Sequence, residues 1–301
     1  MSSDFLGLHF PGGRLAPEHW QALAVLAGES ADGEIQVSGR SGVRVRTGSP
    51  EQLADRAREA GLVPRSTQDG DEAIVASPLA GRLRGRQDIS DLPEQLDRAL
   101  LTRQGRPAGS PGLLFGIDDG SGDVLRHRPD LGLQLSDVEP GRGEVVVAGT
   151  KTGRCASVTD LPLVLADLAG VAVATEGGIA PDGAGHREVL NVLATDSRTA
   201  SESLTAANPP TEAPPVGWVD AHDGTVSLLA VTASGVVSGR LAEFIAVIDR
   251  PTTVSADKVI GVHGLTEGIA EQVVRVLAPM GMIFDAASEW ARAVPIRSRE
   301  T

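Results

Sequence analysis

The feature that most constrains the fold of this chain is a pattern of strand and helix that occurs twice, once near each end. Apolar residues alternate over 6–10 and then follow a helical spacing over 17–27, and the same order returns at 229–231 and 241–248. At a constant offset of 221 residues, Leu8, Trp20, Leu23 and Leu26 lie opposite Leu229, Leu241, Phe244 and Val247. Chance similarity is the alternative, because amphipathic strand–helix units are common. We interpret the pattern as an internal duplication.

Each copy continues with a further strand and helix. In the first copy, residues 35–37 and 43–45 keep a period of two on either side of a Gly-Arg-Ser-Gly break, which predicts a hairpin or a bent strand, and a helix follows from Pro50 to about Ala60. In the second copy the spacing predicts a strand at 259–262 and a helix at 269–277. Gly48 then lies opposite Gly264, and Gly61-Leu62 opposite Gly281-Met282.

The middle of the chain has its own pattern. It predicts a buried strand at 74–76, a helix at 91–101 with its four leucines inward, a strand–turn–strand hairpin at 112–124, a strand at 144–149 and a helix at 159–170. Four prolines mark residues 199–217 as a linker. We therefore expect four segments, namely 1–68, 69–198, the linker 199–217, and 218–301.

Charge and cysteine content exclude several classes of function. A formal net charge of −13 argues against general binding of nucleic acid, and no apolar run is long enough to span a membrane, so we expect a cytoplasmic protein. The single cysteine, Cys155, excludes an intrachain disulfide and any cluster with four cysteine ligands from this chain. The six histidines show no helical pair, and no metal ligand set is predicted.

Two small groups of arginines remain as candidate anion sites. Arg40, Arg44 and Arg46 form one, and Arg82, Arg84 and Arg86 form the other. Guanidinium groups bind carboxylates through two hydrogen bonds, so either group suits a small molecule with several carboxylates. The alternative is that these arginines are solvated residues of strand edges and loops. We expect the first group to alternate along one strand, with all three side chains on the face opposite Val43 and Val45.

Three motifs in order resemble one known family. They are SGRSGVRVRTG at 38–48, VASPLAG at 75–81 and LLFGIDDGSGDV at 113–124. The chain resembles the sirohaem-dependent sulfite and nitrite reductases and precorrin-3B synthase. The resemblance implies an α+β fold, in which two ferredoxin-like half-domains related by a pseudo-twofold flank a mixed α/β middle domain. It also implies that Arg40 binds a carboxylate of the tetrapyrrole and that Arg46 matches a second basic position.

The chain departs from this family at two places. Pro111-Gly112-Leu113 stands where the family has a basic residue that reaches the macrocycle. The chain matches the family through Asp285–Trp290 but has no cysteines after it for a [4Fe-4S] cluster, and Cys155 is not at a ligand position of the family. A [4Fe-4S] cluster is therefore not expected from this chain alone, and whether a partner chain supplies its ligands stays open.

The resemblance implies a precorrin-3B synthase-like oxidoreductase of aerobic cobalamin biosynthesis. A non-catalytic relative that binds a tetrapyrrole or a partner protein is the main alternative, favoured by the missing cysteines, and a nitrite or sulfite reductase-like protein is a weaker one. No catalytic residue is assigned. Asp118 and Asp119 could act in acid–base chemistry or hold iron, but Asp-Asp-Gly-Ser-Gly is also what a tight turn requires, and we favour the turn.

Overall fold

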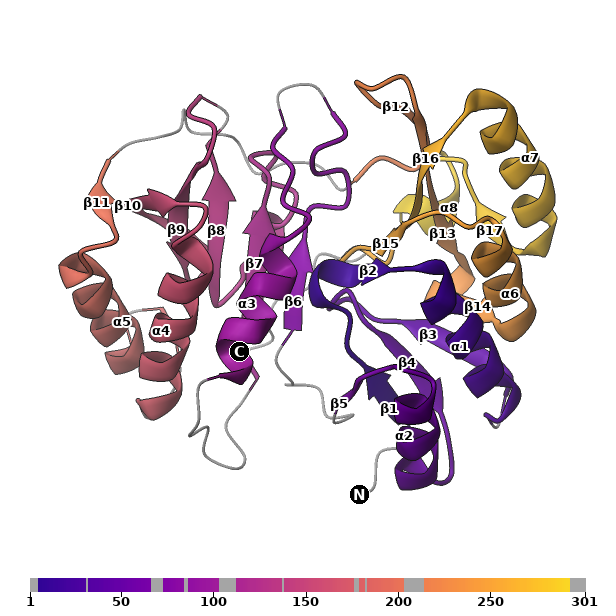
Figure 1. The fold of residues 1–301 in the computed structure, drawn as a ribbon, viewed down its shortest axis with the longest axis horizontal. Helices are drawn as coiled ribbons and strands as arrows, with labels where there is room; N and C mark the ends of the chain where they lie inside the picture. The colour runs from indigo at the N-terminus through magenta and orange to yellow at the C-terminus, as the bar shows by residue number, and fades with distance from the viewer. Residues whose placement is uncertain are drawn as a thin grey trace. The chain divides into compact units, whose positions relative to one another are not determined.

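The structure, a computed structural model, divides the chain into two compact units (Figure 1). The first unit joins the two ends of the chain, residues 1–71 and 213–301, and the second contains the middle, residues 72–212. The structure describes residues 5–30, 32–65, 73–83, 86–102, 112–136, 138–175, 179–181, 183–202 and 214–292. The fold is mixed α+β, as the sequence predicts.

The first unit contains two sheets, and the N-terminal segment forms most of one. In order across this antiparallel sheet, the strands are β14 (Val236–Ser238), β3 (Glu34–Val37), β4 (Val43–Arg46), β1 (Phe5–Leu8) and β5 (Pro64–Arg65). The helices of the segment are α1 (Pro17–Gly28) and α2 (Pro50–Glu59), both begun by proline, which favours the first turn of a helix. The edge strand β14 comes from the C-terminal segment.

The C-terminal segment forms most of the other sheet. In order, its strands are β12 (Gly217–Asp220), β13 (Val226–Thr232), β16 (Ile260–Leu265), β15 (Thr252–Val254) and β2 (Arg14–Leu15), and β17 (Met282–Ile283) also pairs with β13. The helices are α6 (Gly239–Val247), α7 (Glu267–Leu277) and the short α8 (Glu289–Arg292). Here the edge strand β2 comes from the N-terminal segment, so each segment contributes one edge strand to the sheet formed mainly by the other segment. Helices α1 and α6 lie side by side (Figure 1).

The strand pairings give the register in which the two segments correspond. One row across the first sheet is Val237–Ile35–Val45–Leu6, and the matching row of the second is Leu15–Thr252–Val262–Leu228. These rows place Leu6 opposite Leu228. The short 3-10 helices Pro11–Gly13 and Ala233–Gly235 agree, since Gly13 and Gly235 both have φ near +70°.

The offset of 221 residues predicted for the first strand and helix is therefore wrong by one. A shift of one residue moves every side chain of a strand to the other face, so Leu228 and Ala230, not Leu229, match Leu6 and Leu8 in the core. The predicted pairing also matches the buried Leu23 and Leu26 with Phe244 and Val247, which are exposed, whereas α6 buries Leu241, Ala242 and Ile245. Periodicity alone did not exclude the slip, because both faces of β13 are buried.

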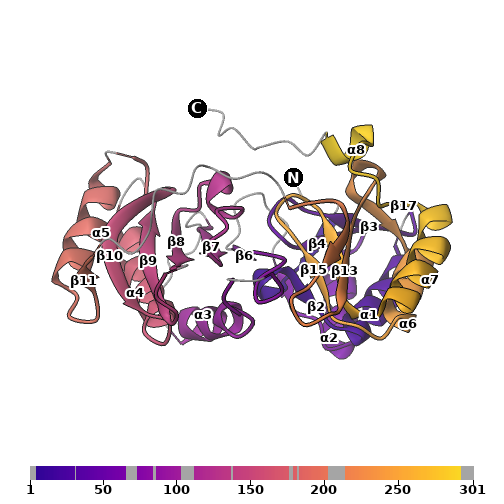
Figure 2. The same ribbon diagram turned by 90° about the horizontal axis from the view of Figure 1, so that it is seen from above.

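The second unit contains one sheet with helices on one side. Its strands are, in order, β11 (Ala200–Ser201), β10 (Thr150–Ser157), β9 (Arg142–Val147), β8 (Leu131–Leu135), β7 (Leu114–Asp118) and β6 (Ala73–Ala76). Strands β6, β7 and β8 run parallel, and the others pair antiparallel. Figure 2 shows α3 (Leu92–Leu101) and α4 (Leu161–Ala174) on one side of this sheet, and α5 (Ala184–Thr195) packs beside α4.

The hairpin predicted at 112–124 is absent from this unit. Strand β7 ends at Asp118, and residues 119–130 cross over the sheet, through the 3-10 helix Leu125–His127, to begin β8 parallel to β7. The crossover packs so closely that a Cβ atom on Gly116 would lie 2.7 Å from Pro129 Cγ. The predicted inward position of Leu101 is also wrong, because its side chain is 71 % exposed at the end of α3.

Among the described residues, no helix has the length and apolar character needed to cross a membrane.

Candidate functional site

The polar groups of the second unit gather where its parallel strands end. Ser77 directly follows β6, Asp118 is the last residue of β7, and Gln134 is near the end of β8. Because the carboxyl ends of parallel strands lie at one edge of a sheet, residues far apart in the sequence meet there, which is where ligands commonly bind in sheets of this kind. Asp118 and Gln134 are almost completely buried, at 0 % and 1 % exposure.

Asp118 is a structural anchor for the chain that leaves β7. Its Oδ1 accepts hydrogen bonds from the Gly120 and Gly122 amides at 2.9 and 2.8 Å and from Gln134 Nε2 at 3.2 Å. Its Oδ2 accepts hydrogen bonds from the Val124 and Leu125 amides at 3.1 and 3.4 Å. These donors compensate the buried charge, so Asp118 acts as the turn residue that the sequence favours.

Fewer hydrogen bonds compensate the burial of the Asp119 and Asp123 carboxyl groups. The Asp119 carboxylate accepts the Ser121 amide at 2.9 Å, and Asp123 accepts the Ser77 hydroxyl at 2.6 Å, while the Asp119 amide donates to the same Ser77 oxygen at 3.1 Å. Burial raises the pKa of Asp123 to about 8, and the charges of Asp118 and Asp119 act in the same direction. Burial also raises the pKa of Asp119, and hydrogen bonds from Ser121, together with the positive charge of Arg86, partly oppose that rise.

The three aspartates form a compact cluster. Each offers one carboxylate oxygen, these atoms all lie within 4.8 Å of one another, and no other group of this kind occurs among the described residues. The sequence motif singles out Asp118 and Asp119 but not Asp123, Ser77 and Gln134. A signal for them existed, since Ser77 and Gln134 stand at the ends of apolar runs, but the parallel order of the strands could not be read from the sequence.

The arginines predicted to bind a ligand lie in the first unit. Arg44 and Arg46 are on β4, with guanidinium carbons 5.5 and 5.1 Å from the centre of the Phe5 ring on the neighbouring strand. Their position on the face opposite the buried Val43 and Val45 is confirmed. Arg46 is half exposed, and its Nε lies 3.7 Å from Asp32 Oδ2. The carboxylate of Asp32 therefore neutralises part of the positive charge of this group.

Arg40 does not continue this row, and the expected alternation of all three arginines along one strand is wrong. It lies in the turn between β3 and β4, where Ser38 Oγ accepts the Arg40 amide at 3.3 Å and the next residue, Ser41, has φ +55°. The hydroxyl of Ser41 is buried without a hydrogen-bond partner. Of the second predicted group, Arg86 is the residue whose charge reaches Asp119, and Arg84 lies outside the described residues.

Two further groups are buried and structural. Cys155 is 0 % exposed on β10, where its sulfur lies 3.4 Å from the Glu202 carbonyl oxygen. His263 is equally buried on β16, with Nδ1 2.9 Å from Ser227 Oγ and Nε2 2.8 Å from Thr253 Oγ1. A Cβ atom on Gly261 would lie 2.7 Å from the imidazole, so the histidine ring fills this space. The two hydrogen bonds of His263 link β16 to β13 and β15, and its ring leaves no room beside Gly261 for a ligand.

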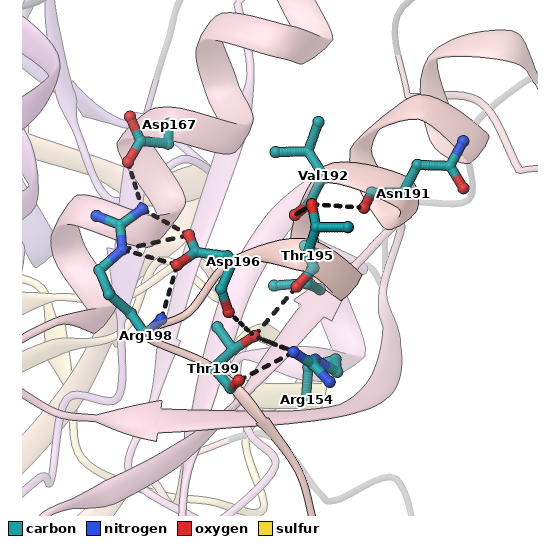
Figure 3. Close-up of polar contacts among 9 residues, drawn as sticks. Arg154, Asp167, Asn191, Val192, Thr195, Asp196, Arg198 and Thr199 are labelled. Carbon is teal, nitrogen blue, oxygen red and sulfur yellow. Dashed lines mark hydrogen bonds and ion pairs between the residues drawn. The ribbon is translucent and has the colours of Figure 1, made fainter.

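A polar network ties the helices of the second unit to its last strands. Figure 3 shows Arg198 between two carboxylates, with Nη2 2.5 Å from Asp167 Oδ2 on α4 and 2.6 Å from Asp196 Oδ2. Arg154 on β10 donates to Thr199, from Nη2 to the carbonyl oxygen at 2.9 Å and from Nε to the hydroxyl at 3.1 Å. The hydrogen bond from Arg198 lowers the pKa of Asp196. We assign this network to stability, because Arg198 pairs with two carboxylates and Arg154 is hydrogen-bonded to Thr199.

Comparison with known proteins shows a likeness in fold to a solved structure. No family model matches the chain, and no curated protein matches its sequence. Among solved structures, the chain is similar to the NirA protein of Mycobacterium tuberculosis, with a TM-score of 0.76 and 17 % sequence identity over 93 % of this chain. The match spans 57 % of the NirA chain. At this identity the likeness shows a common fold.

Proposed function

We propose that this chain binds a tetrapyrrole that carries several carboxylates, the chemical class of sirohaem and the precorrins. The observation that carries the proposal is the likeness in fold, over nearly the whole chain, to NirA, which is a nitrite/sulfite reductase. The motifs in the sequence resemble the same class of enzymes independently of the fold. As part of this proposal, the two segments of the first unit are ferredoxin-like half-domains related by a pseudo-twofold, in agreement with their exchanged edge strands β2 and β14.

The residues of the first unit fit the proposed ligand in chemistry. Arg44 and Arg46 present two guanidinium groups around the Phe5 ring, so hydrogen-bond donors for ligand carboxylates lie beside an aromatic surface. Arg40 stands in the adjoining turn, next to the unsatisfied hydroxyl of Ser41. In this proposal the three arginines hold substituents of the macrocycle, and Asp32 is the group that a ligand carboxylate displaces from Arg46.

The cluster that the family uses does not fit this chain. Four thiolates are needed for a [4Fe-4S] cluster, and the chain has one cysteine, which is buried within a sheet. We therefore derive no electron transfer within the chain. The finer possibilities are a precorrin-3B synthase-like protein of cobalamin biosynthesis, which the motifs favour, and a nitrite or sulfite reductase-like protein, which the fold likeness favours.

A titration with two porphyrins tests the proposal. Uroporphyrin, which has a full set of carboxylates, is expected to bind and to quench tryptophan fluorescence, whereas protoporphyrin, which has few, is expected to bind weakly. Arg40→Ala and Arg44→Ala are each expected to weaken uroporphyrin binding by about 1.5–3 kcal/mol, roughly 10- to 150-fold in Kd, with folding unchanged. The matched control is Arg56→Ala on α2, whose guanidinium pairs with Glu29 and Glu59 and is 61 % exposed.

The competing interpretation gives the opposite pattern. If the arginines only stabilise the fold, Arg40→Ala lowers the melting temperature and leaves the porphyrin titration unchanged. Equal affinity for both porphyrins would also contradict the proposal, because the carboxylates would then contribute nothing. An absorption spectrum after anaerobic purification separates the finer possibilities, since a bound iron macrocycle and a bound metal-free precursor absorb differently.

A further inference from the structure

Two turns of the first unit have the same backbone structure. The first turn, 38–42, joins β3 to β4, and the second turn, 255–259, joins β15 to β16. In each turn, the amide of the opening serine donates to the carbonyl of the last residue at 2.9 Å. The serine hydroxyl oxygen accepts hydrogen bonds from the third and last amides of the turn. The fourth residues, Ser41 and Lys258, have φ +55° and +60°. The two turns therefore match residue by residue, with Lys258 in the place of Ser41.

The side chain of Lys258 lies against the end of β3. A Cβ atom on Gly235 would lie 3.1 Å from Lys258 Cδ and 3.8 Å from Lys258 Nζ. The same atom would lie 3.4 Å from the carbonyl oxygen of Val37, the last residue of β3. The glycine therefore leaves the space that the lysine stem fills. The ammonium group, carried by the C-terminal segment, is held beside the first turn, which belongs to the N-terminal segment.

Lys258 is an unexpected residue for its position. A left-handed backbone conformation is uncommon for residues other than glycine, asparagine and aspartate. The chain has two lysines, and the other, Lys151, places its Nζ 3.4 Å from Glu144 Oε2. Lys258 forms no ion pair with any residue that the structure describes. A cation with a packed stem, an unfavourable backbone conformation and no such carboxylate partner points to a use for the ammonium group.

We propose that Lys258 binds a further carboxylate of the tetrapyrrole, an inference which rests on the proposed function. Arg40 is the third residue of the first turn, and the two turns are in contact, because a Cβ atom on Gly39 would lie 3.5 Å from the Ala256 carbonyl oxygen. The ligand is thus held by both segments where the turns meet. Uroporphyrin and the precorrins carry carboxylates around the whole macrocycle, so cations from two segments pair with different substituents.

The second turn offers a cation through Lys258 alone. Its third residue, which matches Arg40, is Asp257, and this side chain is 2 % exposed. An arginine suits a carboxylate through two fixed hydrogen bonds, whereas an ammonium group on a flexible stem acts as a point charge with three donors. Lys258 therefore adds affinity for a carboxylate without fixing its orientation, and Arg40 fixes the orientation.

The first test repeats the uroporphyrin titration with variants of the lysine. Lys258→Gln, which removes the charge and keeps a polar side chain, should raise the Kd for uroporphyrin about three- to tenfold, because water partly screens a half-exposed ion pair. Lys258→Arg, which keeps the charge, should bind within about twofold of the wild type. The matched control is Lys151→Gln, which removes the other lysine and should leave the Kd unchanged.

The second test needs no substitution, so it holds even if a variant fails to fold. The wild-type chain is acetylated with N-acetoxysuccinimide, and the two lysines are followed by peptide mass spectrometry. Saturating uroporphyrin should protect Lys258 from acetylation and leave the reaction of Lys151 unchanged.

The outcomes separate this inference from the proposed function. If the wild type binds uroporphyrin and Arg40→Ala weakens binding, while Lys258→Gln binds normally and Lys258 stays reactive, the inference is overturned and the proposed function stands. A Lys258→Gln variant that melts at a lower temperature with an unchanged Kd would also overturn it, because the lysine would then be structural. If the wild type does not bind uroporphyrin, both fail.

Discussion

Thr252 on β15 tests how the two segments of the first unit depend on each other. Its hydroxyl accepts a hydrogen bond from Trp20 Nε1 at 2.6 Å and donates one to the Leu15 carbonyl at 2.9 Å. Both partners come from the N-terminal segment, and all three residues are at most 2 % exposed. Thr252→Val keeps the shape of the side chain and removes both hydrogen bonds.

The expected loss of stability follows from what the substitution leaves behind. The indole nitrogen and, in part, the Leu15 carbonyl become buried polar groups without that partner, and each such group lowers stability by about 1–3 kcal/mol. We expect a total of about 2–4 kcal/mol. Thr252→Ser, which keeps the hydroxyl and loses one methyl group, should lose about 1 kcal/mol.

Urea unfolding, followed by tryptophan fluorescence, measures the loss of stability of the first unit. The chain has three tryptophans, Trp20, Trp218 and Trp290, and all lie in the first unit, so the second unit does not contribute to the signal. With a slope of about 2 kcal/mol/M, the midpoint for Thr252→Val should fall by about 1–2 M. A change below about 0.5 kcal/mol, the size seen for ordinary surface substitutions, would refute the role given to Thr252.

Three further predictions concern packing, pH and iron. Gly116→Ala should destabilise the second unit by about 1–3 kcal/mol in scanning calorimetry, because the added Cβ would lie 2.7 Å from Pro129 Cγ. The control is Gly28→Ala at the end of α1, where an added Cβ would have no neighbour within 4 Å apart from the backbone of its own helix, and this variant should not destabilise the first unit. The pKa of Asp196 in the folded protein is below its ordinary value of 3.8. The stability that this carboxylate contributes is therefore present above pH 3.8 and is lost as the pH falls through the folded-state pKa. Asp196→Asn should accordingly reduce the acid sensitivity of calorimetric unfolding. Anaerobic reconstitution of the chain should give no [4Fe-4S] absorption, and iron with matching acid-labile sulfide would contradict this.

The elements that the sequence predicted well are those with strong periodicity and clear ends. The helix from Pro50 ends at Glu59, close to the predicted Ala60, and Gly61 follows with φ +77° as a helix-terminating glycine should. The inner positions of β3 and β4 are also correct, because each strand has only one buried face. The exchange of β2 and β14 could not be predicted, since two- and three-residue strands carry no periodic signal.

The site was harder to predict because its residues meet through the order of strands. The Asp-Asp-Gly turn was recognised, but a hairpin was expected after it, which would have placed Asp118 far from Gln134. The parallel crossover brings them together instead. For the arginines, the alternation rule holds only within a strand, so it was right for Arg44 and Arg46 and wrong for Arg40, which lies in the turn before β4.

The correspondence between the two segments suggests why the first one is the better candidate for binding. Arg46 and Phe5 on the first sheet match His263 and Ser227 on the second, since the paired rows put β4 opposite β16 and β1 opposite β13. On the second sheet these positions are closed, because His263 and Ser227 hydrogen-bond each other and are 0 % exposed. On the first sheet the matching positions hold a half-exposed guanidinium over an aromatic ring. Matching positions therefore carry a buried polar pair in one segment and a half-exposed arginine beside an aromatic ring in the other, and the exposed position is the one at which we propose that an anionic ligand binds.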